Sequence, residues 1–147
     1  MKRSQKLNPV VDIAAKATDA ALIKVGEANA QWSKDKQQLE DLQQYKAEYL
    51  IKLRQGDHTL MNAQKILELR GFLAQLDQAI HAQEQQVATS LRTLQHTQTL
   101  WQQTRSKEQA LESLVGRYQH EEMQSELRRE QQDNDERNTV QWLRKSK

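Results

Sequence analysis

Apolar and small residues recur along the first third of the chain with alternating spacings of three and four positions. This spacing marks one face of an α-helix that packs in a coiled coil. Asn8 is placed to cap such a helix, Pro9 suits its first position, and Asp12 suits its first turn. We predict a helix over about 9–54, with polar residues interrupting the stripe at Asp35 and Lys46. The stripe consists of Val11, Ala14, Thr18, Ala21, Val25, Ala28, Trp32, Asp35, Leu39, Leu42, Lys46, Tyr49 and Leu53.

A polar turn and a second helical stripe follow. The turn is predicted at 55–61, where Gly56 and Asp57 give the clearest turn signal in the chain. A second helix is predicted over about 62–137, although its stripe fades after Tyr118, and a flexible tail is predicted at 138–147. The second stripe consists of Ile66, Leu69, Leu73, Leu76, Ile80, Gln83, Val87, Ser90, Leu94, Thr97, Trp101, Thr104, Glu108, Leu111, Val115 and Tyr118.

Two long helices joined by a short turn predict an all-α antiparallel coiled-coil hairpin. We expect residues 1–147 to form a single domain in which the second helix overhangs the first. The register of the two helices stays open at this point. The expected core comprises Val25, Trp32, Leu39, Leu53, Ile66, Leu69, Leu73, Ile80, Val87, Leu94, Trp101 and Leu111.

The composition agrees with a narrow apolar seam. The chain has 147 residues, of which 36% are hydrophobic and 29% charged, with four glycines and one proline. A globular enzyme of this length normally carries more apolar residues and more glycine. With no cysteine there is no disulfide framework and no thiolate metal site. A net charge of +2 with both signs interspersed does not indicate a nucleic-acid partner. No apolar run approaches the roughly 18 residues that a membrane span needs.

No pattern in the chain indicates catalysis or cofactor binding. The glycines are isolated, so there is no phosphate-binding loop. The four histidines lack the spacing of a helical metal site, and carboxylate pairs such as Glu121 and Glu122 are expected to be solvated. The sequence therefore favours a non-enzymatic protein without metal or cofactor. The basic ends of the chain permit weak contact with phosphate or acidic lipid, but charged ends that maintain solubility are the favoured explanation.

Large apolar residues occur outside the seam on both sides of the predicted turn. Tyr45 and Phe72 hold flanking positions beside Lys46 and Leu73, and Leu50 and Ile51 add to the excess. Exposed aromatic surface usually indicates a binding partner. An equally favoured interpretation is that these side chains lean over the seam and widen the core. The pattern alone leaves both interpretations open.

At these same residues the sequence resembles the FliJ family of the bacterial flagellar type III export apparatus. The similar stretches are 38–49, from Gln38 to Tyr49, and 72–80, from Phe72 to Ile80. Trp101, the run 105–107, Leu111, Leu114 and the polar run 130–136 follow in the family's order. The resemblance covers nearly the whole chain.

The resemblance implies a hairpin shaped like the central stalk of rotary ATPases. By this resemblance, the end that carries both termini inserts into the ring of the export ATPase (FliI), and substrate chaperones also bind. The surface near the turn engages the cytoplasmic domain of the export gate (FlhA). The expected location is the cytoplasm, peripherally at the inner membrane, with a role in flagellum assembly, motility and chemotaxis. The residues implied for gate binding are Gln38, Leu42, Tyr45, Tyr49, Phe72, Leu76, Ala79 and Gln83.

Two alternative functions stay open at this stage. A virulence-type secretion system uses a stalk protein of equivalent shape, and gene neighbourhood would distinguish it. A coiled coil with basic ends that binds nucleic acid is the other alternative, for which strongly salt-dependent retention on DNA is the expected sign.

Overall fold

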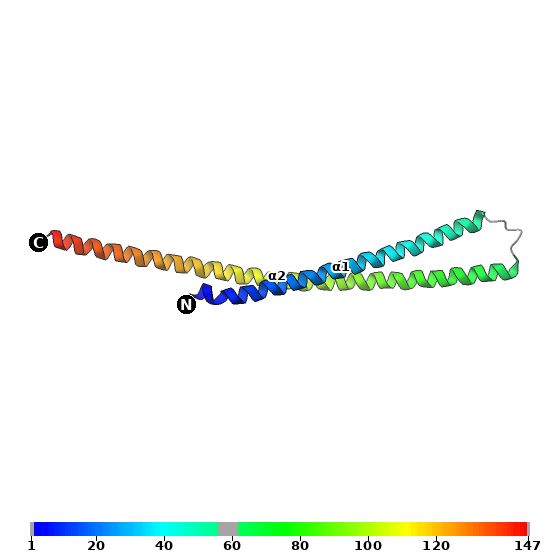
Figure 1. Cartoon of the computed structure of the whole chain (residues 1–147), viewed down its shortest axis with the longest axis horizontal. Helices are drawn as coiled ribbons and strands as arrows, with labels where there is room; N and C mark the ends of the chain where they lie inside the picture. The colour runs from blue at the N-terminus through cyan, green and yellow to red at the C-terminus, as the bar shows by residue number, and fades with distance from the viewer. Residues whose placement is uncertain (1, 56–61, 147) are drawn as a thin grey trace. The chain divides into compact units, whose positions relative to one another are not determined.

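Two long helices make up almost all of the described chain. The computed structural model of the protein describes residues 2–55 and 62–146. Over these ranges α1 spans Arg3–Gln55, α2 spans Ala63–Lys145, and no strand occurs (Figure 1). The prediction of an all-α antiparallel hairpin is confirmed. The predicted turn signal at Gly56 and Asp57 lies outside the described residues.

The loop-side ends of both helices lie within one residue of their predicted positions. α1 ends at Gln55 and α2 begins at Ala63. The side-chain oxygen of Asn62 accepts a hydrogen bond of 2.9 Å from the backbone N–H of Lys65. Asn62 is therefore the N-cap of α2 and satisfies one of the donors that a helix start leaves unpaired.

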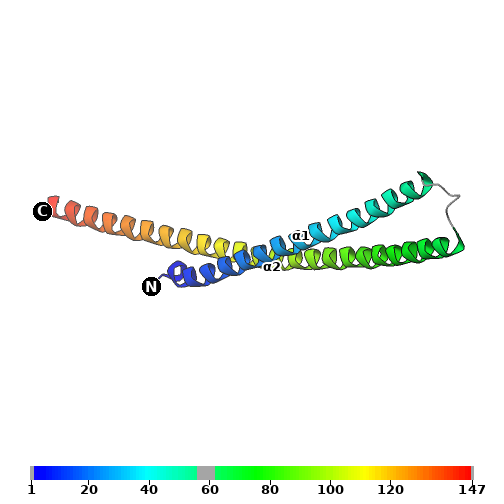
Figure 2. The same ribbon diagram turned by 45° about the vertical axis from the view of Figure 1, so that its right-hand side comes forward.

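The chain divides into two compact units. The terminal unit comprises residues 1–19 and 102–147, and the central unit comprises residues 20–101. In the terminal unit Lys2 contacts Glu126, and Thr18, further along α1, contacts Glu108, which precedes Glu126 in α2. The central unit has the same antiparallel pairing, because Asp35 contacts Gln86 and Tyr49 contacts Phe72. Figures 1 and 2 show the two helices of this unit running in opposite directions.

The core is a narrow seam along the facing stripes of the two helices. Each seam residue is covered from one side only, so most are half-buried, and Leu94 is the most completely buried apolar residue at 4% exposure. The predicted core residues that the structure buries or half-buries are Val25, Trp32, Leu39, Leu53, Leu69, Leu73, Ile80, Val87, Leu94, Trp101 and Leu111. The periodic stripe therefore predicts the buried face well.

Ile66 is the exception among the predicted core residues. It is 39% exposed, more than any other member of that set. Ile66 lies in the first turn of α2, one turn closer to the loop than Leu69. Because Leu69 already faces Leu53, close to the end of α1 at Gln55, little of α1 remains to cover Ile66.

The predicted start of α1 was wrong by six residues. α1 begins at Arg3, and Pro9 lies inside the helix instead of opening it. An interior proline costs about 3 kcal/mol, because it removes one backbone hydrogen bond and crowds the preceding turn. Contacts with α2 offset this cost, since Ser4 is buried and Leu7 is half-buried in the same seam. The sequence predicted a local cap at Asn8, but it gave no indication that Ser4 contacts Glu122 in α2.

The predicted end of α2 was also wrong. The helix continues to Lys145, eight residues past the predicted end at residue 137, so residues 138–145 are helical. No proline or glycine, the residues that most disfavour a helix interior, follows Gly116. All residues from Met123 to Ser146 are exposed, and no contact with α1 is seen beyond Glu126 in the described residues. This segment is the predicted overhang of α2.

Polar residues that interrupt the two stripes pair with each other across the seam. In the terminal unit the Ser4 hydroxyl donates a hydrogen bond of 2.7 Å to Glu122. In the central unit Gln83 donates to the backbone carbonyl of Asp35 at 2.9 Å, and Lys46 lies 2.5 Å from Asp77. A shifted register would leave the buried Ser4 and the half-buried Glu122 and Gln83 without these partners, whereas Asp77 is exposed and would lose less. The polar pairs therefore fix the register within each unit.

Two glycines give a direct test of how freely the outer helix faces accept substitution. Gly26 and Gly116 are helical, neither has a positive φ, and a Cβ added at either position meets no atom within 4 Å. We expect Gly26→Ala and Gly116→Ala each to raise the free energy of unfolding by about 0.5–1 kcal/mol, because alanine loses less backbone entropy on folding. Urea unfolding followed by circular dichroism checks this, and a destabilised variant contradicts it.

Candidate functional site

Three aromatic side chains gather on one flank of the central unit. The ring of Phe72, from α2, lies edge-on to Tyr45 at 6.3 Å and tilted against Tyr49 at 4.8 Å. Both distances lie in the range of favourable aromatic pairs. Tyr45 remains 51% exposed, although it contacts Phe72. The side chains therefore lean over the seam and also present aromatic surface to solvent.

A groove opens beside this aromatic cluster, toward the loop. It has a volume of about 470 Å³ and is lined by Tyr49, Leu53, Lys65, Glu68, Leu69 and Phe72. Apolar walls come from both helices, while Lys65 and Glu68 supply one charge of each sign at its edge. An apolar groove with a charged rim has the make-up of a protein-binding surface.

Gln83 lies on the same flank and contacts a buried residue of the seam. Its side-chain amide donates to the backbone carbonyl of Asp35 at 2.9 Å and lies 3.4 Å from the side-chain oxygen of Gln38. Asp35 is only 3% exposed, and its carboxylate also accepts a hydrogen bond of 3.0 Å from Gln31. The buried residue Asp35 therefore fixes the position of the Gln83 side chain.

The residues implied for gate binding do not all reach the surface. Tyr45, Tyr49 and Phe72 form one cluster, and Gln38 and Gln83 form a second. Leu76 is only 7% exposed and packs in the seam, so the hairpin does not present it as a contact residue. Gln38, Tyr45 and Ala79 are exposed, whereas Leu42, Tyr49, Phe72 and Gln83 are half-buried.

Sequence reasoning missed the outer part of the groove. Leu53 and Leu69 were predicted as core residues only, and Lys65 and Glu68 were not singled out. The structure places all four on the groove wall. The available signal was their position in the last seam layer before the loop, where the seam has a neighbouring layer on one side only.

Charged residues at the start of α1 attach the chain to α2 in the terminal unit. Lys2 forms an ion pair of 2.6 Å with Glu126, and the Arg3 guanidinium lies 5.7 Å from the centre of the Tyr118 ring. The hydrogen bond from the Ser4 hydroxyl lowers the pKa of Glu122 below its usual value, with further help from the Ser4 backbone and Lys2. The hydrogen bond and charge of Glu126 raise the pKa of Lys2.

A second carboxylate lies close to a hydroxyl further along the terminal unit. The Thr18 hydroxyl, which donates a hydrogen bond of 3.1 Å to the Ala14 carbonyl, lowers the pKa of the nearby Glu108, and Arg105, whose guanidinium lies 3.3 Å from this carboxylate, adds to the effect. Glu108 and Glu122 therefore both favour their ionised forms in the folded chain.

These lowered pKa values predict a loss of stability in acid. Below the pKa of the unfolded state the unfolded chain binds more protons, so the contribution of Glu122 is complete above about pH 4.5 and falls as the pH drops through its folded pKa. We expect Glu122→Gln to destabilise the chain at pH 7 and much less at pH 3. Urea unfolding at both pH values measures the difference, with exposed Glu130→Gln as the control. An equal effect of Glu122→Gln at both pH values contradicts the assignment.

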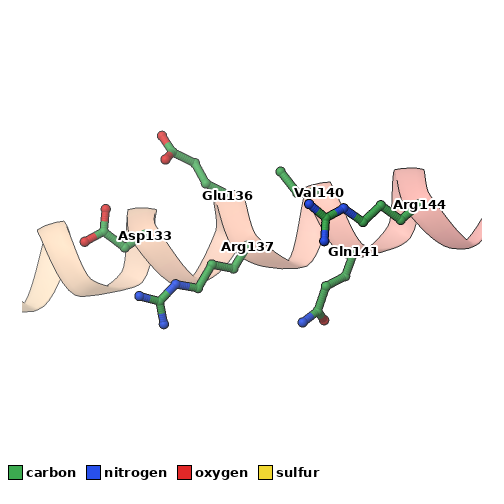
Figure 3. A pocket seen from close by; sticks show the side chains of 6 residues that line it. All are labelled: Asp133, Glu136, Arg137, Val140, Gln141 and Arg144. Atoms are coloured by element: carbon green, nitrogen blue, oxygen red, sulfur yellow. The ribbon is translucent and has the colours of Figure 1, made fainter.

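The overhang of α2 carries one face on which two acidic residues are followed by two basic residues. Asp133, Glu136, Arg137, Val140, Gln141 and Arg144 line a shallow groove on this single helix (Figure 3). Trp142 and Leu143 are exposed on the adjoining faces.

Within residues 2–55 and 62–146 no group of three or more histidine, aspartate or glutamate side chains is placed to hold a metal ion. Neither helix, over the part of the chain that is described, has an apolar stretch long enough to cross a membrane.

The fold is a helical hairpin, with an aromatic cluster in the central unit and an exposed helical overhang in the terminal unit. Comparison with protein families matches the flagellar FliJ protein model over residues 2–147. The chain belongs to this family, which relates it to flagellar protein export and to a non-catalytic class of component. Searches of curated proteins and of solved structures found no match.

Proposed function

We propose that the protein is a stalk and adaptor of the bacterial flagellar type III export apparatus. In this proposal the terminal unit inserts into the ring of the export ATPase (FliI), and the central unit contacts the cytoplasmic domain of the export gate (FlhA). Unloaded substrate chaperones bind the same protein. The protein then acts at the cytoplasmic face of the inner membrane and is needed for motility and chemotaxis.

The exposed cluster of Tyr45, Tyr49 and Phe72 is the observation that carries the gate contact. These three rings come from two helices, pack against one another, and adjoin a groove of about 470 Å³. Rigid aromatic side chains beside a pocket are typical of the residues that dominate binding energy. The family match supports export as the process, and the hairpin supports a structural role in place of catalysis.

The overhang of α2 supports the ring contact. It extends as helix to Lys145, its residues are exposed, and one face carries charges of both signs. Such a face suits a partner whose inner surface also carries both signs of charge.

Co-purification with the export ATPase tests the proposed function. We expect the chain to promote ring formation and to raise ATP hydrolysis several-fold. Arg137→Glu with Arg144→Glu should reduce both effects, since it reverses charges on the proposed contact face. Lys24→Glu with Lys34→Glu, which reverses two exposed charges in the central unit, is the matched control. Failure of the unaltered chain to change either ring formation or hydrolysis contradicts the proposal.

A further inference from the structure

Two different starts of α1 compete within the first twelve residues. Asn8 suits an N-cap, Pro9 suits the first helical position, and Asp12 suits the first turn, so local preference favours a helix that begins at Pro9. The structure instead begins α1 at Arg3 and encloses Pro9. Because proline has no N–H, the carbonyl of Gln5 lacks the helical hydrogen bond that a residue four positions later would normally donate.

The longer start depends on contacts with α2. The Ser4 hydroxyl and backbone N–H donate to Glu122 at 2.7 and 3.2 Å. Lys2 pairs with Glu126 at 2.6 Å, and Arg3 lies over Tyr118. Leu7 adds one half-buried apolar contact to the seam. The contacts of Lys2 and Arg3 lie at exposed positions, and pairs of this kind are individually weak.

We propose that residues 2–8 form a detachable arm, and that α1 exchanges between a long form starting at Arg3 and a short form starting at Pro9. In the long form the arm is held by Glu122, Glu126 and Tyr118. In the short form the Asn8 side chain caps the helix, the arm leaves α2, and Ser4 and Leu7 leave the seam. The long form keeps the contacts with α2 but encloses Pro9 in the helix. The short form loses those contacts but places Asn8 and Pro9 at their preferred positions, so the two forms have similar free energies.

Release of the arm changes the surface of the terminal unit. It uncovers Tyr118 and Glu122, and it removes the positive charges of Lys2 and Arg3 from this part of α2. The exchange is a property of the isolated chain and goes beyond the proposed function, so its test needs no export protein.

Pulsed electron paramagnetic resonance on the full chain measures the exchange directly. The protein has no cysteine, so nitroxide labels can be attached specifically to Gln5→Cys and Gln119→Cys, two exposed positions. We expect a short distance from the long form together with a longer, broader population from the short form. Lys2→Ala with Ser4→Ala should raise the ratio of released to attached arm about tenfold, because two contacts with α2 are lost. Pro9→Ala should lower the ratio at least tenfold, because the long helix regains its missing hydrogen bond.

Labels at Asp19→Cys and Gln109→Cys, also exposed and in the terminal unit, provide the control, since their distance should be single and the same in every variant. Asn8→Ala discriminates between the two starts. It should shift the arm toward attachment, because Asn8 is an exposed helix residue in the long form and a cap only in the short form. Hydrogen exchange of the amides of residues 3–8 should change in parallel. A single narrow distance that neither Lys2→Ala with Ser4→Ala nor Asn8→Ala alters would falsify the detachable arm.

Discussion

Replacing Tyr45 and Phe72 together by alanine is expected to weaken binding of the export gate domain by about tenfold to a hundredfold. Truncating two neighbouring aromatic contact residues typically costs a few kcal/mol of binding energy, and each 1.4 kcal/mol is a factor of ten. The fold should survive, because Tyr45 is 51% exposed and its ring contact with Phe72 contributes only about 1 kcal/mol. Calorimetric titration of the gate domain and thermal unfolding of the variant measure the two quantities separately.

Ile51→Ala is the matched control for this substitution. Ile51 lies in the same part of α1 and is also 51% exposed, but it is not part of the aromatic cluster or of the groove wall. It should leave gate binding unchanged. If the double variant binds the gate domain as tightly as the unaltered chain, the aromatic cluster is not the gate-binding surface. If Ile51→Ala weakens binding equally, exposed apolar area in general, and not this cluster, drives association.

Asp35→Leu is expected to stabilise the hairpin by about 2 kcal/mol and to loosen its register. Asp35 is 3% exposed, and its carboxylate is bound by the amides of Gln31 and Gln86. A leucine there would extend the apolar seam between Trp32 and Leu39, and such replacements of a buried polar seam residue usually gain stability. The same change removes the contact of 3.4 Å between Gln86 and the Asp35 carboxylate across the seam, although the hydrogen bond from Gln83 to the backbone carbonyl of residue 35 remains. Urea unfolding should show the gain, and sedimentation should show species larger than the unaltered chain.

Asp41→Leu separates this effect from a general preference for leucine in helices. Asp41 is exposed on α1 and accepts a hydrogen bond only from Gln37, one turn earlier in the same helix. It should change the free energy of unfolding by no more than about 0.5 kcal/mol. A destabilised Asp35→Leu variant would show that the amide contacts of Asp35 contribute more than the leucine gains.

Much of the fold could be predicted because the residues that pack in the core of a coiled coil recur at a regular spacing in the sequence. Leu39, Leu73 and Leu94 fall on stripes that alternate spacings of three and four, and the structure buries or half-buries all of them. The loop-side helix ends follow from local signals as well, such as the cap at Asn62. Such features depend on residues near one another in the sequence.

The features that were missed depend on residues far apart in the sequence. Asp35 and Gln83 read as interruptions of two separate stripes, and only their pairing across the seam explains them. Ser4 gave no local signal for an earlier helix start, since its partner Glu122 lies in the other helix. The buried state of Leu76 follows from its place in the second stripe, whereas the family resemblance grouped it with residues implied for gate binding, because resemblance does not measure exposure.

Two hydroxyl–carboxylate pairs in the terminal unit limit the insertions and deletions that the two helices can accept. Thr18 lies two heptads after Ser4, and Glu108 lies two heptads before Glu122, so the two pairs repeat with the period of the seam itself. Deleting or inserting whole heptads in α1 and α2 together, between these pairs, keeps every remaining seam residue opposite its partner. A change in one helix alone shifts one pair out of alignment with the other. Related chains of different length are therefore expected to differ by matched multiples of seven residues in the two helices.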